Sequence, residues 1–186
     1  DFVPSILGLR DGILYSEWIE DSPNSAKEIN RNKIVEIVSE YVAARVKELS
    51  FEEDPSSFIS EPQVGMLLVH RNHSGTLLGR IVNRLKTEAF PYKLSALRCP
   101  VPCLIDGNMR IADWLKRELE IVKIDYAHHG LGKIEVNITD PAYDLANGIL
   151  AFEMSEQEET DLLQRYMSIS GDVDLTERIT LYKVLT

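Results

Sequence analysis

The chain has 186 residues, of which 44% are hydrophobic, so it can bury one sizeable core without a second domain. Its 20 lysines and arginines stand against 30 acidic residues, giving a net charge of -10. This balance offers no general attraction to a nucleic-acid backbone or an anionic membrane, and no apolar run approaches the roughly 18 residues that span a bilayer. We therefore expect neither as a partner. A nucleotide bound through magnesium stays open, because the ion bridges carboxylates to phosphates.

The first elements are predicted from turn signals and periodicity. Asp11-Gly12 predicts a turn before a strand at Ile13–Tyr15, followed by an exit segment through Glu17 and Ile19. Apolar residues at three- and four-residue spacing then predict a long helix from about Ser25 to Leu49. A surface loop is expected at 51–62, and a helix weakened by glycines at 63–86.

The second half alternates short strands with helices. Prolines exclude a continuous helix over 90–102, and the apolar Val101–Ile105 leads into Asp106-Gly107-Asn108. Residues 120–126 predict a strand that ends at Asp125. Asp140 as N-cap and Pro141 in the first turn predict a helix over 143–152. Ser155 and Glu158 form a capping-box pattern, and a last helix is expected over 175–185.

Three acidic segments follow one another in an informative order. They are Asp106-Gly107-Asn108, then Val122-Lys123-Ile124-Asp125-Tyr126, then Asp140-Pro141-Ala142-Tyr143-Asp144-Leu145-Ala146. This order resembles the catalytic half of the aminoglycoside phosphotransferase and choline kinase group, which is protein-kinase-like. The resemblance implies that Asp106 orients or deprotonates an acceptor hydroxyl. It also implies that Asp125 binds Mg²⁺ on the phosphates of ATP.

The same resemblance implies a fold and a division of the chain. The fold is α+β and predominantly helical, a kinase-like carboxyl-terminal lobe with a short hinge strand and a small β-hairpin that carries the site. Residues 1–20 would be a hinge from a missing amino-terminal lobe, and residues 21–186 the lobe itself. Asp1 stands where a complete chain would have Met, which also predicts a preceding part. The backbone groups of Glu17 and Ile19 would bind the adenine ring.

The loop around Asp106 departs from the family's His-x-Asp-x-x-x-x-Asn pattern. Leu104 replaces the His and Ile111 occupies the Asn position, so Asn108 is our candidate for a second magnesium ligand through its amide oxygen. Asp106 also suits a plain turn former. The departure motivates an alternative function, a kinase-like binding or regulatory module without turnover.

The remaining polar residues receive supporting roles. Asp144 is expected to brace the loop of Asp106 by hydrogen bonds. His128 and His129 follow Asp125 and could contact an anionic substrate or bind a transition metal, which would suit a metal-dependent hydrolase as a third candidate. Further expectations are surface histidines (His70, His73), packing tryptophans (Trp18, Trp114) and two reduced thiols rather than a zinc site (Cys99, Cys103).

The functional hypothesis is an ATP- and Mg²⁺-dependent phosphotransferase that acts on a hydroxyl of a small metabolite. Phosphoryl transfer needs mainly positioning and charge neutralisation, for which a base near the acceptor and a carboxylate that holds the metal are the minimum set. Asp106 and Asp125 fill these two roles. The reduced thiols favour a cytoplasmic location.

Overall fold

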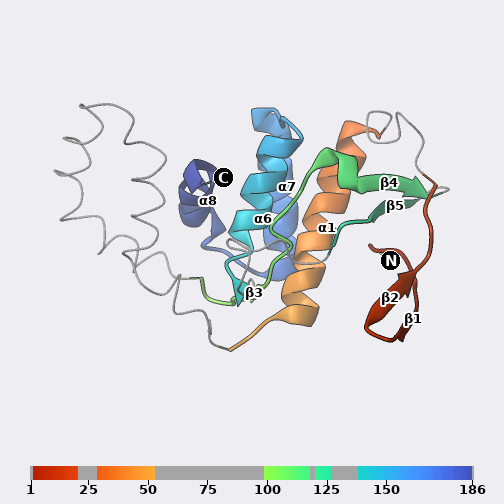
Figure 1. Cartoon of the computed structure of the whole chain (residues 1–186). Helices are drawn as coiled ribbons and strands as arrows, with labels where there is room; N and C mark the ends of the chain where they lie inside the picture. Colours follow the sequence, from red (N-terminus) through yellow and green to blue (C-terminus); the bar gives the residue numbers. More distant parts are fainter. Residues whose placement is uncertain (1, 21–28, 53–98, 118–119, 127–137, 186) are drawn as a thin grey trace, which may run out of the picture.

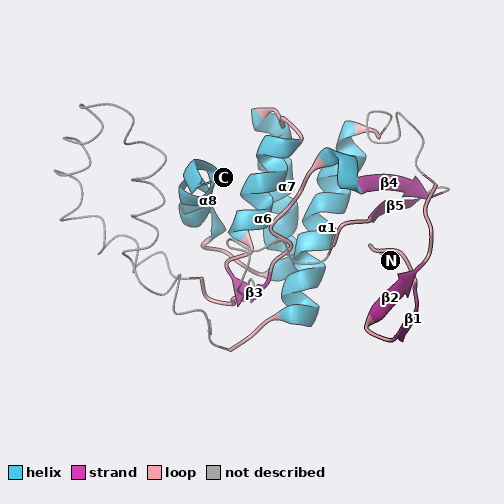
Figure 2. Cartoon of the chain, viewed as in Figure 1, coloured by secondary structure: helices cyan, strands magenta, loops and turns pink. Residues whose placement is uncertain are grey.

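The computed structural model describes residues 2–20, 29–52, 99–117, 120–126 and 138–185, and within them the fold is mixed α+β (Figures 1 and 2). The helices are α1 (Arg31–Leu49), α6 (Ala142–Ala151), α7 (Glu156–Ser170) and α8 (Leu175–Leu185), with a 3₁₀ turn, η1, at Ile111–Asp113. The strands form three two-stranded antiparallel pairs: β1 (Ile6–Arg10) with β2 (Ile13–Ser16), β3 (Cys103–Leu104) with β6 (Ile138–Thr139), and β4 (Trp114–Arg117) with β5 (Glu120–Lys123).

Helix α1 begins later than the periodicity predicted. Residues 25–28 lie outside the described residues, and Asn30 is the N-cap, its side chain accepting a hydrogen bond from the backbone N–H of Asn32. Asn is among the preferred N-cap residues because its side-chain oxygen satisfies an N–H that the helix leaves unpaired. The helix therefore starts at Arg31 and ends at Leu49, as predicted for its end.

Helix α7 confirms its predicted capping box, whereas α6 begins one residue earlier than predicted and has Pro141, not Asp140, as its N-cap. In α7 the Ser155 side chain accepts from the Glu158 N–H and the Glu158 side chain accepts from the Ser155 N–H, which is the predicted capping box. Gly171 ends α7 in the left-handed conformation, at φ 76°. Helix α8 spans the predicted residues, and α6 starts at Ala142 with Pro141 as its cap, whereas the carboxylate of Asp140 accepts the Ala142 N–H.

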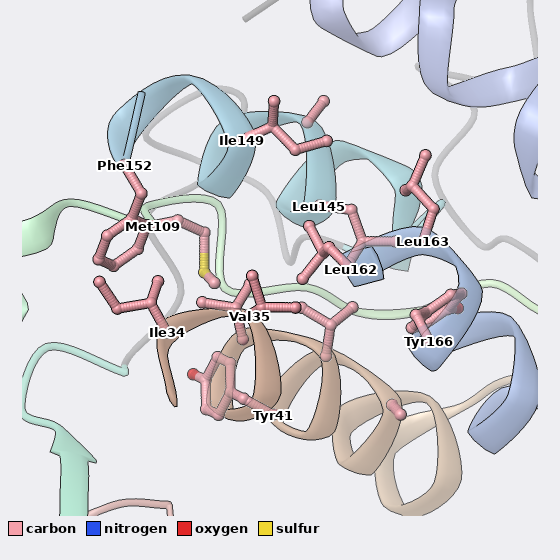
Figure 3. Packing of buried hydrophobic residues seen from close by; sticks show 14 of the residues in the cluster. Ile34, Val35, Tyr41, Met109, Leu145, Ile149, Phe152, Leu162, Leu163 and Tyr166 are labelled. Carbon is pink, nitrogen blue, oxygen red and sulfur yellow. The ribbon is translucent and has the colours of Figure 1, made fainter. Parts of the chain in front are cut away.

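One apolar core joins the helices, and α1 packs against both α6 and α7 (Figure 3). A Cβ on Gly148 of α6 would meet Val38 Cγ1 of α1 at 3.2 Å, so this glycine permits the close approach of the two helices. Met109 and Trp114 enter the same core from the loop after β3 and from β4, and both are fully buried. Trp114 therefore has the predicted packing role. Because Met109 is part of the core, the loop that follows β3 is packed against the helices.

The β1–β2 hairpin lies apart from the helices at one side of the chain (Figure 1). Asp11 and Gly12 both have positive φ, as the predicted tight turn requires. Six large apolar side chains of the hairpin are at least half exposed: Ile6, Leu7, Leu9, Ile13, Leu14 and Tyr15. Trp18 is 88% exposed, so its predicted packing role is wrong.

Several predictions fall outside the described residues, namely the loop and helix at 53–86, with His70 and His73, and the pair His128 and His129. None of the helices within the described ranges combines the length and apolar character needed to cross a bilayer.

Candidate active site

The loop that carries Asp106 is held at its backbone by α6. It follows β3, which pairs with β6, and then crosses the first turn of α6. There Asp144 accepts hydrogen bonds from the backbone N–H groups of Asp106 and Gly107, both at 2.8 Å, and Asn147 one turn later accepts the Met109 N–H at 2.9 Å. These bonds are of the kind expected for Asp144. The loop path is consequently set by a helix rather than by the loop itself.

The Asp106 carboxylate is fully buried and surrounded by donors. Its Oδ2 accepts the Tyr41 hydroxyl at 2.5 Å and lies 3.6 Å from Lys123 Nζ, and its Oδ1 accepts the Asn108 N–H at 3.2 Å. Burial and then the charge of Asp106 raise the pKa of Tyr41, which keeps this phenol protonated as a donor. Asp106 therefore lies on the predicted loop, and its carboxylate is bonded to neighbouring protein groups.

Arg45 orients the Tyr41 hydroxyl that donates to Asp106. Its Nη1 donates to the Tyr41 hydroxyl oxygen at 2.8 Å, and its Nε donates to the Leu104 carbonyl at 2.9 Å. Because the Tyr41 oxygen accepts from Arg45, its proton is directed to Asp106. Tyr41 and Arg45 are four residues apart on the buried face of α1, so one helix face supplies both groups.

Lys123, at the end of β5, is the second buried cation of the site. Its side chain is fully buried, and Nζ lies 3.6 Å from Asp106 Oδ2 and 3.5 Å from Asp113 Oδ2. Nζ also donates to the backbone carbonyl of Asp125. Strand β5 ends at Lys123, two residues before the predicted end at Asp125.

Asp113 and Asn108 complete the cluster on its more open side. The Asp113 side chain is 16% exposed, and its Oδ2 accepts a hydrogen bond from Asn108 Nδ2 at 3.1 Å. We refer to Asp106, Asn108, Asp113 and Lys123, together with the bracing Asp144, as the acidic centre. Of its carboxylates, Asp113 has the most access to solvent, because Asp106 and Asp144 are buried.

The carboxylate of Asp144 has a raised pKa. Burial, and then the charge of Asp106, raise the pKa of Asp144 to about 6, although the two backbone N–H bonds oppose that shift. The group therefore changes charge near neutral pH. Its protonation is coupled to the charge of Asp106 beside it.

The candidate metal ligands have the right chemistry for magnesium, because carboxylate and amide oxygens are hard donors. Asp125 follows β5 and is partly exposed, and Asn108 belongs to the acidic centre. Lys123, however, already lies between Asp106 and Asp113, where an ion would need to sit to use both carboxylates. Within the ranges that the structure describes, no three His, Cys, Asp or Glu residues lie close enough together to hold an ion.

The predicted hinge contacts the site through the opposite edge of β5. The Phe2 carbonyl accepts the Lys123 N–H at 2.7 Å, and the Phe2 ring packs edge-on against Tyr41. The Glu17 N–H donates to the Ser5 carbonyl, and the Glu17 carboxylate pairs with Arg117 at 2.9 Å. The backbone N–H of Glu17 is thus used inside the hairpin, and adenine binding by Glu17 and Ile19 stays a prediction.

A buried ion cluster fixes the start of α6. Arg178 of α8 bonds both oxygens of Asp140, at 2.7 and 3.3 Å, and both oxygens of Asp172, at 3.0 and 2.5 Å. Arg178 and Asp140 are each 1% exposed. This clamp holds the turn that precedes Asp144. The N-cap position predicted for Asp140 belongs to Pro141, and the Asp140 carboxylate instead pairs with Arg178 and accepts the Ala142 N–H.

The two thiols are free, with Cys103 buried and Cys99 partly buried. Burial raises the pKa of Cys99 to about 12, which disfavours the thiolate that zinc requires.

Sequence reasoning missed Lys123, Asp113, Tyr41 and Arg45. Two of them carried a signal, because Arg45 falls on the apolar face of a long helix and Lys123 interrupts the apolar run of a strand. A charged residue in either position must find a buried partner.

Comparison with known proteins adds no assignment: no family model, no curated protein and no solved structure matches the chain.

Proposed function

We propose that the chain is a kinase-like carboxyl-terminal lobe that serves an ATP- and Mg²⁺-dependent phosphotransferase, with a hydroxyl of a small metabolite as acceptor. A single observation carries the proposal. Asp144 accepts hydrogen bonds from the backbone N–H groups of Asp106 and Gly107, and so ties the first and the last of the three acidic segments together. Lys123 ties the middle segment to the same point, through Asp106 and the Asp125 carbonyl.

Each residue has a role that follows from its place. Asp106 is the candidate base, Asp125 the candidate ligand of the ion, and Asp144 a positioning residue that acts through the loop backbone. Magnesium bound to ATP would supply a phosphoryl group whose charge is already partly neutralised. His128 and His129 are candidates for contact with the substrate, and a cytoplasmic location fits the free thiols.

The second candidate is a kinase-like binding or regulatory module without turnover, and the environment of Asp106 favours it. A base must reach the proton that it removes. Asp106 is fully buried and engaged with Tyr41, Lys123 and the Asn108 N–H. Turnover therefore requires that the loop opens toward the acceptor, whereas a binding module has no such requirement.

The first experiment measures ATP binding by the full-length protein with and without Mg²⁺ by calorimetry. Wild type is compared with Asp125→Ala and with the control Asp161→Ala, which removes an exposed acid of α7. We expect magnesium-dependent binding that is lost in Asp125→Ala and kept in the control. Wild type that is folded but does not bind ATP would overturn the phosphotransferase and favour the binding or regulatory module. Unchanged binding by Asp125→Ala would overturn the metal role of Asp125.

A second experiment separates the two candidates. Hydrolysis of ATP in the absence of an acceptor is measured for wild type and Asp106→Asn. The enzyme is expected to hydrolyse ATP slowly and to lose about 10²-fold or more of that rate in the variant, with ATP affinity kept. Binding without any hydrolysis or transfer to a panel of small alcohols would identify the module without turnover.

A further inference from the structure

Lys123 holds a position that oxygen ligands define. Its ammonium group is in contact with two carboxylates, from Asp106 and Asp113, and with the carbonyl of Asp125, so three segments contribute oxygen atoms to one buried cation. Carboxylate and backbone carbonyl oxygens are also the donors that hard divalent cations take in proteins. The side chain of Lys123 is fully buried, so the ammonium does not extend to solvent.

The charges around this position favour a cation. Asp106, Asp113 and Asp144 bring three carboxylates to the acidic centre, against Lys123 and the Arg45 guanidinium from α1. Arg45 does not compete for the position, because its own bonds go to the Tyr41 hydroxyl and the Leu104 carbonyl. Lys123 is thus the cation that faces both carboxylates, the buried one of Asp106 and the more exposed one of Asp113.

We propose that Lys123 is a built-in cation that takes the place of a second divalent ion, so that the site works with a single Mg²⁺ held on the side of Asp125. This inference rests on the proposed function for the identity of the ion that remains. It deepens that function, because it assigns the number of divalent ions that the site holds.

The contact geometry supports an exchangeable position rather than a closed ion pair. Lys123 Nζ lies 3.5 and 3.6 Å from the two carboxylates, beyond the 2.7–3.2 Å of an ordinary N–H to O hydrogen bond. The carboxylate oxygens keep other donors, namely Tyr41 and Asn108. A point charge at this separation neutralises the acids without dictating the geometry of the loop.

The test removes the charge of Lys123 and asks whether a divalent ion replaces it. Thermal unfolding of Lys123→Met and of Lys123→Gln, which keeps an amide donor, is followed with and without Mn²⁺, in the full-length protein and without nucleotide. At 100-fold excess over its dissociation constant, Mn²⁺ is expected to raise the unfolding midpoint of both variants by roughly 5–10 °C more than that of wild type. Counting bound Mn²⁺ by electron paramagnetic resonance should give one more ion per chain in the variants.

Lys183→Met is the matched control. It removes the same charge from a lysine that pairs with one carboxylate, Glu159 of α7, and it should behave as wild type toward Mn²⁺. The proposal is overturned if both Lys123 variants bind no additional Mn²⁺, or if both stay unfolded when Mn²⁺ is added.

The Mn²⁺ measurements need no ATP, so the proposed function and the proposed role of Lys123 can be refuted independently. Absence of ATP binding in wild type would remove the proposed function and leave the Mn²⁺ result intact. Wild type that binds ATP together with two divalent ions would keep the proposed function and overturn the role of Lys123.

Discussion

In the described part of the chain, two buried cations each lie between a pair of aspartates, and they differ in how many carboxylate oxygens they bond. Arg178 uses its planar guanidinium to bond all four oxygens of Asp140 and Asp172, at 2.5–3.3 Å. Lys123 lies 3.5 and 3.6 Å from single oxygens of Asp113 and Asp106, which bond to other groups as well. The arginine cluster is a closed clamp that fixes α8 to the start of α6. The lysine cluster is a network whose members have alternative partners.

The difference shows what each residue type allows. A guanidinium has five donors in a fixed fork, so it specifies the position of two carboxylates at once. An ammonium is a compact charge that tolerates rearrangement of the groups around it. Both clusters therefore use aspartates, but the arginine makes one of them rigid and the lysine leaves the other adaptable. The four experiments below test this distinction, beginning with the largest expected effect.

Replacing Arg178 with Met should cost about 3–5 kcal/mol in the free energy of unfolding, because it leaves Asp140 buried without its counter-charge. Urea denaturation measures this loss. The control is Arg165→Met, whose pair with Glu40 is solvent-exposed and should contribute less than about 1 kcal/mol. Equal losses in the two variants would contradict the closed clamp.

Replacing Asp144 with Asn should cost about 1–3 kcal/mol, because the amide places an NH2 group against one of the two backbone N–H donors that the carboxyl group meets with an oxygen in either protonation state. The cost should also depend on pH. The folded pKa of about 6 lies above the model value of 3.8, so the native state binds the proton more tightly, and this stabilisation is complete below pH 3.8 and lost as pH rises through 6.

The stability advantage of wild type over Asp144→Asn should accordingly shrink between about pH 4 and 7, measured by denaturation at several pH values. A constant difference across that window would show that the Asp144 carboxylate titrates alike in the folded and unfolded chain.

Replacing Tyr41 with Phe should cost about 1–2 kcal/mol. The variant keeps the ring contacts with Phe2 and Trp114 but removes the donor to Asp106 and the acceptor of Arg45. Chemical denaturation, with the exposed Tyr15→Phe as the control, measures the effect. A loss as large as that of Arg178→Met would mean that the acidic centre is no more adaptable than the clamp.

Replacing Glu158 with Gln should have the smallest effect, about 0.5–1 kcal/mol at neutral pH. The Arg31 guanidinium and the Ser155 N–H lower the pKa of Glu158 to about 2, so its contribution is present above pH 4.5 and lost as pH falls through 2. Denaturation at pH 7 and pH 3 measures this. A cost near that of Arg178→Met would show that the Arg31–Glu158 pair contributes as much stability as a buried cluster, so burial would not explain the larger effects.

The helices were predictable where local signals act within one turn. The capping box at Ser155 and the apolar spacing of α1 each depend on neighbours in sequence. Asn30 shows the limit of periodicity, since Ile29 fits the apolar spacing but the Asn side chain caps the helix after it. The α+β class follows from these elements and the short strand signals.

The acidic loop was predictable as a place but not as a set of contacts. Asp106 and Asp144 were named from a motif, and the bonds between Asp144 and the loop backbone are those expected. The partners of Asp106 come from α1 and β5, which are 65 and 17 residues away, and no local rule pairs residues at such separations. Lys123 carried a signal of burial, because it interrupts an apolar run, but that signal does not say which carboxylates it will face.

The bond from the Lys123 N–H to the Phe2 carbonyl makes one backbone amide a sensor of this region. Hydrogen exchange at that amide requires the first residues of the chain to separate from β5, and the same separation frees the Phe2 ring from Tyr41. Its exchange rate relative to the Val122 N–H, which pairs within the β4–β5 ladder, would therefore report how often the amino-terminal segment leaves. A fusion partner or tag that pulls residue 1 away from β5 would therefore raise the exchange rate of the Lys123 N–H.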